Sequence, residues 1–181
     1  MLKKFILAAA ASCFLFMFPL AFAQESSPLS PLPSPSPIEY ALPYPGILPD
    51  HPLYFIKRFR DIILQLLITN PVKKVEFDIL MADKHLNMAI FLFDKSKPSL
   101  AVNTVSEGFN YLSKAETNVF TLPIDNKTET ANTKHRLEKS LLKHEEIFTT
   151  LVTKTNGDEK VKMELLHTKV KDLLADFYGK K

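Results

Sequence analysis

Apolar residues recur every three to four positions over most of the chain beyond residue 50, which is the period of a helix with one buried face. No segment alternates apolar and polar residues as a half-buried strand does. Proline and glycine interrupt the pattern at a few points. It therefore predicts five helices, at about residues 51–69, 71–95, 99–120, 126–154 and 158–178. Short connections favour antiparallel neighbours, so the expected fold is all-α, an antiparallel bundle of about five helices.

Each predicted helix has an apolar stripe expected to face the core. The stripes are Ile56, Phe59, Ile63 and Leu66; Val75, Ile79, Ala82, Leu86 and Ala89; Val105, Phe109, Leu112 and Val119; Leu137, Leu141, Phe148 and Leu151; and Met163, Leu166, Val170, Leu173 and Phe177. In the first helix, Lys57, Arg58, Arg60 and Asp61 are expected on the outer face.

Several residues predict local features of the helices. Asp50 is the expected cap of the first helix, and Asn70 followed by Pro71 marks the start of the second. Asp125 or Asn126 is the expected cap of the fourth helix. Gly108, inside the third helix, costs up to ~1 kcal/mol relative to alanine. We therefore expect it where another helix approaches closely.

The first 23 residues have the layout of a secretory signal peptide. Lys3 and Lys4 precede an uncharged apolar stretch, and Ala21-Phe22-Ala23 forms a small-x-small cleavage site before Gln24. The expected location is therefore extracytoplasmic, either secreted or in the cell envelope. The stretch is also about as long as the ~20 apolar residues that span a bilayer. If it is not cut, it is a membrane anchor with its N-terminus inside.

A third interpretation is a lipoprotein modified at Cys13. Ala10 stands three positions before this cysteine instead of leucine, and the apolar run continues past it, which disfavours lipidation. Cys13 is the chain's only cysteine. The mature protein is therefore expected to have no disulfide and no cysteine metal site.

Composition divides the remaining chain into two parts. Residues 24–41 form a Ser/Pro-rich tether that buries too little to fold, and residues 42–181 form the predicted helical domain. The signal segment contains two of the 23 basic residues and no acid, so the mature chain has 21 basic and 20 acidic residues. A net charge near +1 gives no indication of nucleic-acid binding.

The most distinctive string is Leu42-Pro43-Tyr44-Pro45-Gly46-Ile47-Leu48-Pro49-Asp50-His51-Pro52-Leu53-Tyr54, and Asn70-Pro71-Val72-Lys73-Lys74 and Ala82-Asp83-Lys84-His85-Leu86 follow. It resembles an exported bacterial helical family catalogued as domain of unknown function 5667. Its pattern is similar to P-G-x-L-P-D-x-x-L-Y, and the resemblance covers about residues 40–120. It implies an exported helical domain and supplies no activity.

We call residues 42–52 the strap. Pro45-Gly46 fits a type II turn, which needs φ > 0 at the glycine. Tyr44, Ile47, Leu48, Tyr54 and Phe55 are expected to pack the strap against the bundle. Alternatively, the strap presents an interaction surface, whose residues are Tyr44, Pro45, Gly46, Leu48, Pro49, Asp50 and Tyr54.

One motif has the spacing of a metal ligand pair. Glu164 and His167 form an E-x-x-H sequence, which carboxylate-bridged di-iron bundles use twice. The chain has one copy, so a solvated helix face is the favoured interpretation. Phosphate-binding glycine loops and nucleophile elbows are missing from the sequence. We expect no catalytic residue, no cofactor and no metal.

These features favour an exported, non-catalytic helical domain that acts by macromolecular interaction at the cell envelope. The expected partner is an envelope protein or surface component, with the membrane added if the N-terminal segment is retained. The alternatives are a metal-binding bundle that uses Glu164 and His167, and an extracytoplasmic chaperone with a concave apolar surface.

Overall fold

The computed structural model describes residues 37–123 and 127–181. The predicted signal segment, the tether up to residue 36, and the predicted caps Asp125 and Asn126 lie outside the described residues. One compact unit extends from Pro37 to Lys181.

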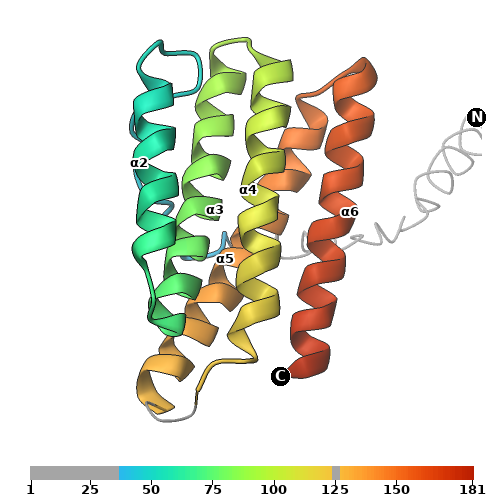
Figure 1. Ribbon diagram of the computed structural model, residues 1–181. Coiled ribbons are helices and arrows are strands. Elements are labelled where there is room, and N and C mark those ends of the chain that lie inside the picture. The colour runs from blue at the N-terminus through green and yellow to red at the C-terminus, as the bar shows by residue number, and fades with distance from the viewer. Residues whose placement is uncertain (1–36, 124–126) are drawn as a thin grey trace, which may run out of the picture. The chain divides into compact units, whose positions relative to one another are not determined.

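Five helices and no strand are found within the described residues, which confirms the all-α bundle (Figure 1). They are α2 (Tyr54–Leu67), α3 (Pro71–Asp94), α4 (Pro98–Val119), α5 (Lys127–Thr153) and α6 (Gly157–Lys180). Successive helices run up and down, with α5 behind α3 and α4 in Figure 1. No helix in the described ranges combines the length and the apolarity that a membrane crossing requires.

Helices α3 to α6 bury the stripes that the sequence predicts. Leu86 on α3, Leu112 on α4, Phe148 on α5 and Val170 on α6 are fully buried in one hydrophobic core. Phe109 and Leu173 are partly buried at its edge. The most extensive contact joins α3 to α4.

Gly108 explains how α3 and α4 come so close. A Cβ at this position would lie 2.8 Å from the Cβ of His85 and 3.3 Å from the carbonyl oxygen of Ala82. Real Cβ atoms do not approach other atoms at the first distance, so glycine is needed here. The expectation of a close helix approach at Gly108 is confirmed.

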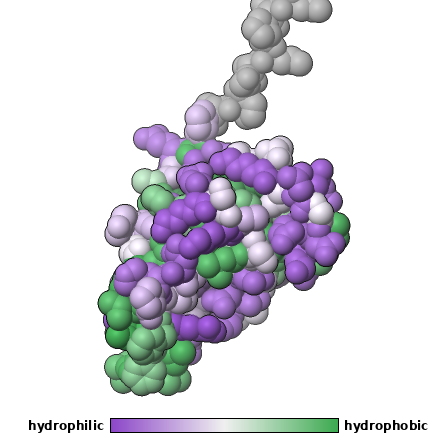
Figure 2. Space-filling view, turned by 90° about the horizontal axis from the view of Figure 1, so that it is seen from above, coloured by the Kyte–Doolittle hydropathy of each residue, from purple (hydrophilic) through white to green (hydrophobic). Residues whose placement is uncertain are grey.

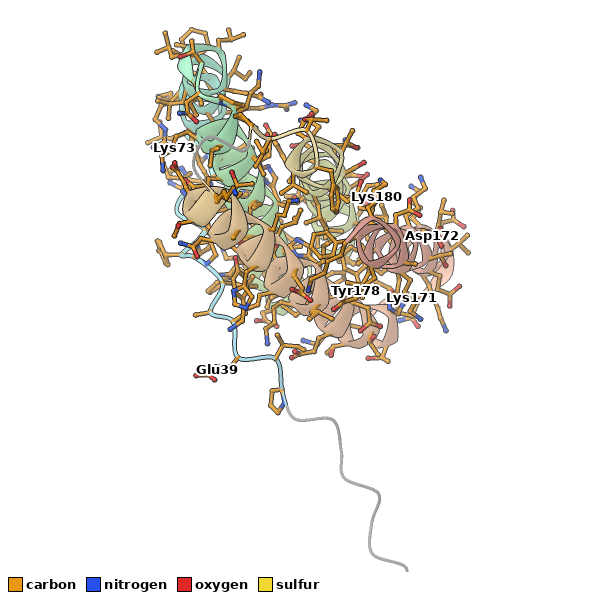
Figure 3. The ribbon with its side chains drawn as sticks, turned by 90° about the horizontal axis from the view of Figure 1, so that it is seen from below. Glu39, Lys73, Lys171, Asp172, Tyr178 and Lys180 are labelled. Carbon is orange, nitrogen blue, oxygen red and sulfur yellow. The ribbon has the colours of Figure 1, made fainter. Side chains whose placement is uncertain are left out.

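The start of α3 also agrees with the sequence. The side chain of Asn70 accepts a hydrogen bond from the backbone N–H of Lys73 at 3.0 Å, and Pro71 occupies the first turn. This satisfies one of the free N–H groups at the helix start. One end of the bundle, where α3 and α5 begin and α4 and α6 end, carries two ion pairs between helices. Lys73 on α3 reaches Glu129 on α5 at 3.2 Å, and Lys180 on α6 reaches Glu116 on α4 at 2.8 Å (Figure 3).

Candidate functional site

Helix α2 turns Lys57 and Asp61 inward and its apolar side outward, while Arg58 and Arg60 are exposed as predicted. Its buried residues are Lys57 and Asp61, with 8% and 7% of their surface exposed. The predicted core stripe is exposed instead, up to 78% at Leu66. The predicted orientation of this helix is therefore wrong. The helical spacing of the apolar residues is as predicted, but the face that they form points to solvent instead of towards the core.

The outward side of α2 forms one continuous apolar surface, which we call the α2 face. Figure 2 shows hydrophobic colour gathered over this corner of the molecule. Its exposed residues are Phe55, Ile56, Phe59, Ile62, Ile63, Leu66 and Leu67. A shallow open hollow between Phe55, Phe59 and Ile62 lies within it. Contiguous exposed apolar patches mark protein–protein or membrane interaction sites, ligand-binding grooves, or surfaces that aggregate.

Lys57 explains why the polar side of α2 faces inward. Its Nζ donates to the carbonyl oxygens of Pro45 at 2.6 Å and Ile47 at 3.1 Å, and it lies 3.3 Å from Sδ of Met88. Burial lowers the pKa of this amine from its usual value. Gly46, between the two acceptors, has φ of +72°, which confirms the positive φ predicted for it. This turn brings both carbonyl groups to one donor.

The strap is attached through polar bonds and through Leu42, which packs against the hydrophobic core, and part of the apolar packing that the sequence predicts is missing. Tyr44 is 80% exposed, and Ile47 and Phe55 are exposed as well, so these three do not pack on the bundle. Pro45 is buried, and Leu48, Pro49, Asp50 and Tyr54 are partly buried. The side-chain amide of Asn87 donates to the carbonyl oxygen of Pro43 at 2.9 Å.

Asp50 does not cap α2. The helix begins at Tyr54, and its N-cap residue Leu53 makes no side-chain capping bond. Asp50 instead accepts from Lys97 at 2.8 Å and from Lys95 at 3.1 Å. These two bonds hold the pKa of the Asp50 carboxyl below its usual value. The predicted cap is therefore an ion pair that fixes the strap to the connection between α3 and α4.

A small, partly open cavity of about 210 Å³ with a mixed polar and apolar lining lies between α2, α3 and α4. Its lining includes Tyr54, Asp61, His85, Glu107 and Tyr111. Burial raises the pKa of Tyr54 to about 12 and lowers that of His85. Both side chains are therefore neutral near pH 7. The cavity offers hydrogen-bonding groups for a small polar molecule or for water.

His85 is held in a fixed orientation in this cavity. Its Nδ1 donates to the carbonyl oxygen of Met81 at 2.7 Å, and its ring lies against Tyr111 with centroids 5.5 Å apart. Its Nε2 is 3.8 Å from Glu107, which also lies 3.7 Å from Arg58 on α2. The Arg58–Glu107 contact lies on the solvent side of the cavity and joins α2 to α4.

A second polar cluster, inside the bundle, was not predicted. Asp83 on α3 accepts from the Tyr40 hydroxyl and from the Ser140 hydroxyl, each at 2.6 Å, and His144 lies 3.8 Å away. Burial and the Asp83 charge raise the pKa of Tyr40 to about 12. Burial also lowers the pKa of His144.

Serine, histidine and aspartate also make up hydrolytic triads, but this geometry differs from a triad. The Ser140 hydroxyl donates to Asp83, and Nδ1 of His144 donates to the Ser140 carbonyl oxygen at 2.8 Å. Ser140, His144 and Asp83 are also fully buried, so no substrate reaches them. The cluster joins the segment before the strap to α3 and α5.

Glu164 and His167, the ligands of the metal-binding alternative, do not converge with other ligand groups. Glu164 is exposed, and its nearest charged partner is Lys160 at 4.0 Å. His167 instead contacts Glu145 and Thr149 on α5, each at 3.3 Å. Within residues 37–123 and 127–181, no three histidine, cysteine or acidic side chains lie close enough together to hold an ion. The metal-binding alternative thus gains no support from the geometry.

Comparison with known proteins identifies a family. No curated protein and no solved structure matches the chain. A family model with the description Domain of unknown function matches residues 46–158. The match contains most of the strap, helices α2 to α5, and the turn before α6, so it extends beyond the 40–120 region of the predicted resemblance. The chain belongs to the family Domain of unknown function (DUF5667).

Proposed function

We propose that this protein is an exported, non-catalytic helical domain that binds a component of the cell envelope through the α2 face. The observation that carries the proposal is the reversed orientation of α2. Eight large apolar side chains of α2 are exposed, seven of them on the α2 face, while a lysine and an aspartate of the same helix are buried. Exposing this much apolar surface to water costs free energy, which a bound partner recovers.

The polar anchors of α2 support this proposal. Lys57, Asp50 and Asn87 hold the strap and α2 by specific hydrogen bonds, so the apolar side is kept outward in a defined position. A helix held in this way presents a pre-organised surface, which lowers the entropy cost of binding. The surface follows the outer side of one helix. That shape favours a docking face over the concave surface expected of a chaperone.

Site-specific photo-cross-linking in the native cells tests the proposal. A photoreactive phenylalanine analogue at Phe59 is expected to form a defined cross-linked product. The same analogue at Lys171, on the exposed side of α6 (Figure 3), is the control and is expected to form none. Equal yields at both positions, or no product at Phe59, would contradict the proposed role of the α2 face.

Export is tested separately by fractionation and by mass spectrometry of the N-terminal peptide. A mature start at Gln24 supports cleavage after Ala23, and an intact Met1 in the membrane fraction supports an anchor. Protein found only in the cytoplasm would contradict export and leave the α2 face to be judged by cross-linking.

A further inference from the structure

The edges of the α2 face are basic. By the ~100° rotation per residue of an α-helix, its seven apolar residues cover an arc of ~140°. Arg58 lies just beyond one edge of this arc, and Arg60 lies just beyond the other, between the arc and the exposed Leu64. Both side chains are mostly exposed. Lys84 and Arg60 also line an open groove of about 390 Å³ between the strap and α2.

From this arrangement we infer that the α2 face docks on the surface of an anionic lipid bilayer. This inference rests on the proposed function and names the envelope component. Helices that lie in a membrane interface have an apolar face flanked by Lys or Arg, whose stems extend along the apolar surface towards the headgroups. At ~1.5 Å per residue, α2 is ~21 Å long, which suits a helix lying along the interface.

The charges favour lipid headgroups over a second copy of this chain. The only acidic residue of α2 is Asp61, which is buried and bonded by Arg60 at 2.6 Å. A pair of α2 faces would therefore bring four arginines together with no exposed acid on either helix. Glu107 lies 3.7 Å from Arg58, but an exposed pair at this distance is weak. Anionic headgroups supply the missing negative charge on both edges.

The length of the segment before Pro37 is compatible with α2 lying on a membrane. Residues 24–36 separate the predicted apolar segment from the compact unit that begins at Pro37. A Pro/Ser-rich chain of that length reaches ~40 Å when it is extended. If the apolar segment is retained as an anchor, this length limits the distance of Pro37 from the membrane to ~40 Å. If it is cleaved, the α2 face is the remaining attachment.

An environment-sensitive fluorophore on α2 tests the inference in the full chain. Cys13 is first changed to Ser, and Phe59→Cys is then labelled with a nitrobenzoxadiazole group. Leu165→Cys, an exposed apolar position on α6, is the matched control. Vesicles contain either phosphatidylcholine alone or phosphatidylcholine with about 30% phosphatidylglycerol. Because the N-terminal segment is identical in both proteins, any anchoring by it affects the two probes equally.

The expected result is a blue-shifted probe at position 59, quenched by spin-labelled lipid, with anionic vesicles. We expect about tenfold weaker binding to neutral vesicles, and a smaller difference at high salt, since headgroup attraction is screened. The probe at position 165 should stay in water. Circular dichroism of both labelled proteins checks that the bundle is folded.

Three outcomes would overturn the bilayer inference. They are a probe at 59 that remains in water with both vesicles, equal insertion of both probes, and burial at 59 without lipid together with a doubled mass in solution. The last outcome identifies a second copy as the occupant. If the probe stays in water but Phe59 cross-links to one envelope protein in cells, the proposed function stands and only the bilayer inference fails.

Discussion

Helices α3 to α6 and helix α2 contain the same kind of pattern and use it in opposite ways. In α3, the positions that repeat every three to four residues are buried, as at Ile79 and Leu86. In α2, the equivalent positions are exposed, as at Phe59 and Leu66. The four-helix core buries its apolar stripes against one another, whereas α2 contacts the core with a lysine and an aspartate.

The comparison shows what a helical period determines. It determines which side chains share a face, because 3.6 residues complete a turn. Whether that face points to the core or to solvent depends on the hydrogen-bonding groups of the segment that packs against the helix. The strap offers the carbonyl groups of Pro45 and Ile47, which need a donor when they are covered, and Lys57 supplies it. Helix α6 has the ordinary polarity, with Lys171 and Asp172 on its exposed side (Figure 3).

Replacing one leucine in each region should give the largest difference in the free energy of unfolding. Leu86→Ala removes a fully buried side chain from the core and is expected to lower the free energy of unfolding by about 2–5 kcal/mol. Leu66→Ala removes a mostly exposed side chain from α2 and should change it by less than about 0.5 kcal/mol. Urea titration measures both. A large loss in Leu66→Ala would show that the α2 face is covered in solution.

Adding one methyl group between α3 and α4 should give the next largest effect. Gly108→Ala places a Cβ 2.8 Å from His85, so the helices must separate, at an expected cost of about 1–3 kcal/mol. Gly179→Ala is the control, since nothing lies within 4 Å of its added Cβ, and it should be neutral or stabilising by up to ~1 kcal/mol. Similar thermal melting temperatures for the two variants would refute the close approach.

The architecture of α3 to α6 could be predicted because local signals and packing agree there. Asn70-Pro71 marks a helix start, the stripes mark the buried faces, and Gly108 marks the tight contact. The orientation of α2 could not be predicted in the same way. It depends on bonds from Lys57 to carbonyl groups ten and twelve residues earlier in the chain. The spacing of apolar and polar residues along the sequence does not show which backbone carbonyl groups a side chain will reach.

The buried cluster around Asp83 was missed although part of its signal is visible. Leu137, Leu141, Phe148 and Leu151 leave a gap that His144 fills at the spacing of the same stripe. A polar residue at a core position needs a partner, which indicates a buried network. Its partners could not be named, because Ser140 and Asp83 are 57 positions apart. Such pairs become visible only when the helices are placed side by side.

Asp78 provides a pH-dependent test of the α3 side of the comparison. Its carboxyl group is buried, one of its oxygens has no hydrogen-bond partner, and burial raises its pKa from 3.8 to about 6. The folded state therefore binds this proton more tightly than the unfolded state. The contribution of Asp78 to stability is greatest below pH 3.8 and is lost as the pH rises through about 6.

Asp78→Asn replaces the charged form with a neutral group of the same shape. At pH 8 it should raise the free energy of unfolding by about 1–2 kcal/mol, a value reduced for partial solvent screening. The gain should shrink as the pH falls from 7 to 4. Urea titrations of the two proteins across this range measure it. A gain independent of pH would exclude desolvation of Asp78 as its cause.

Lys57→Met should have the smallest global effect and the most local one. The variant keeps the length of the side chain and removes the donor to Pro45 and Ile47, so the strap and the start of α2 should open more often. Amide hydrogen exchange is expected to report a local opening free energy lowered by about 1–2 kcal/mol over residues 46–61. Exchange in α3 to α6 should change little, because Lys57 contacts Met88 on α3 but lies outside the hydrophobic cluster that joins these helices. Arg58→Met is the matched control, since Arg58 is exposed and its 3.7 Å ion pair with Glu107 is weak. Faster exchange throughout the bundle in Lys57→Met would mean that α2 and the core unfold as one unit, and the contrast between the two regions would then be one of orientation alone.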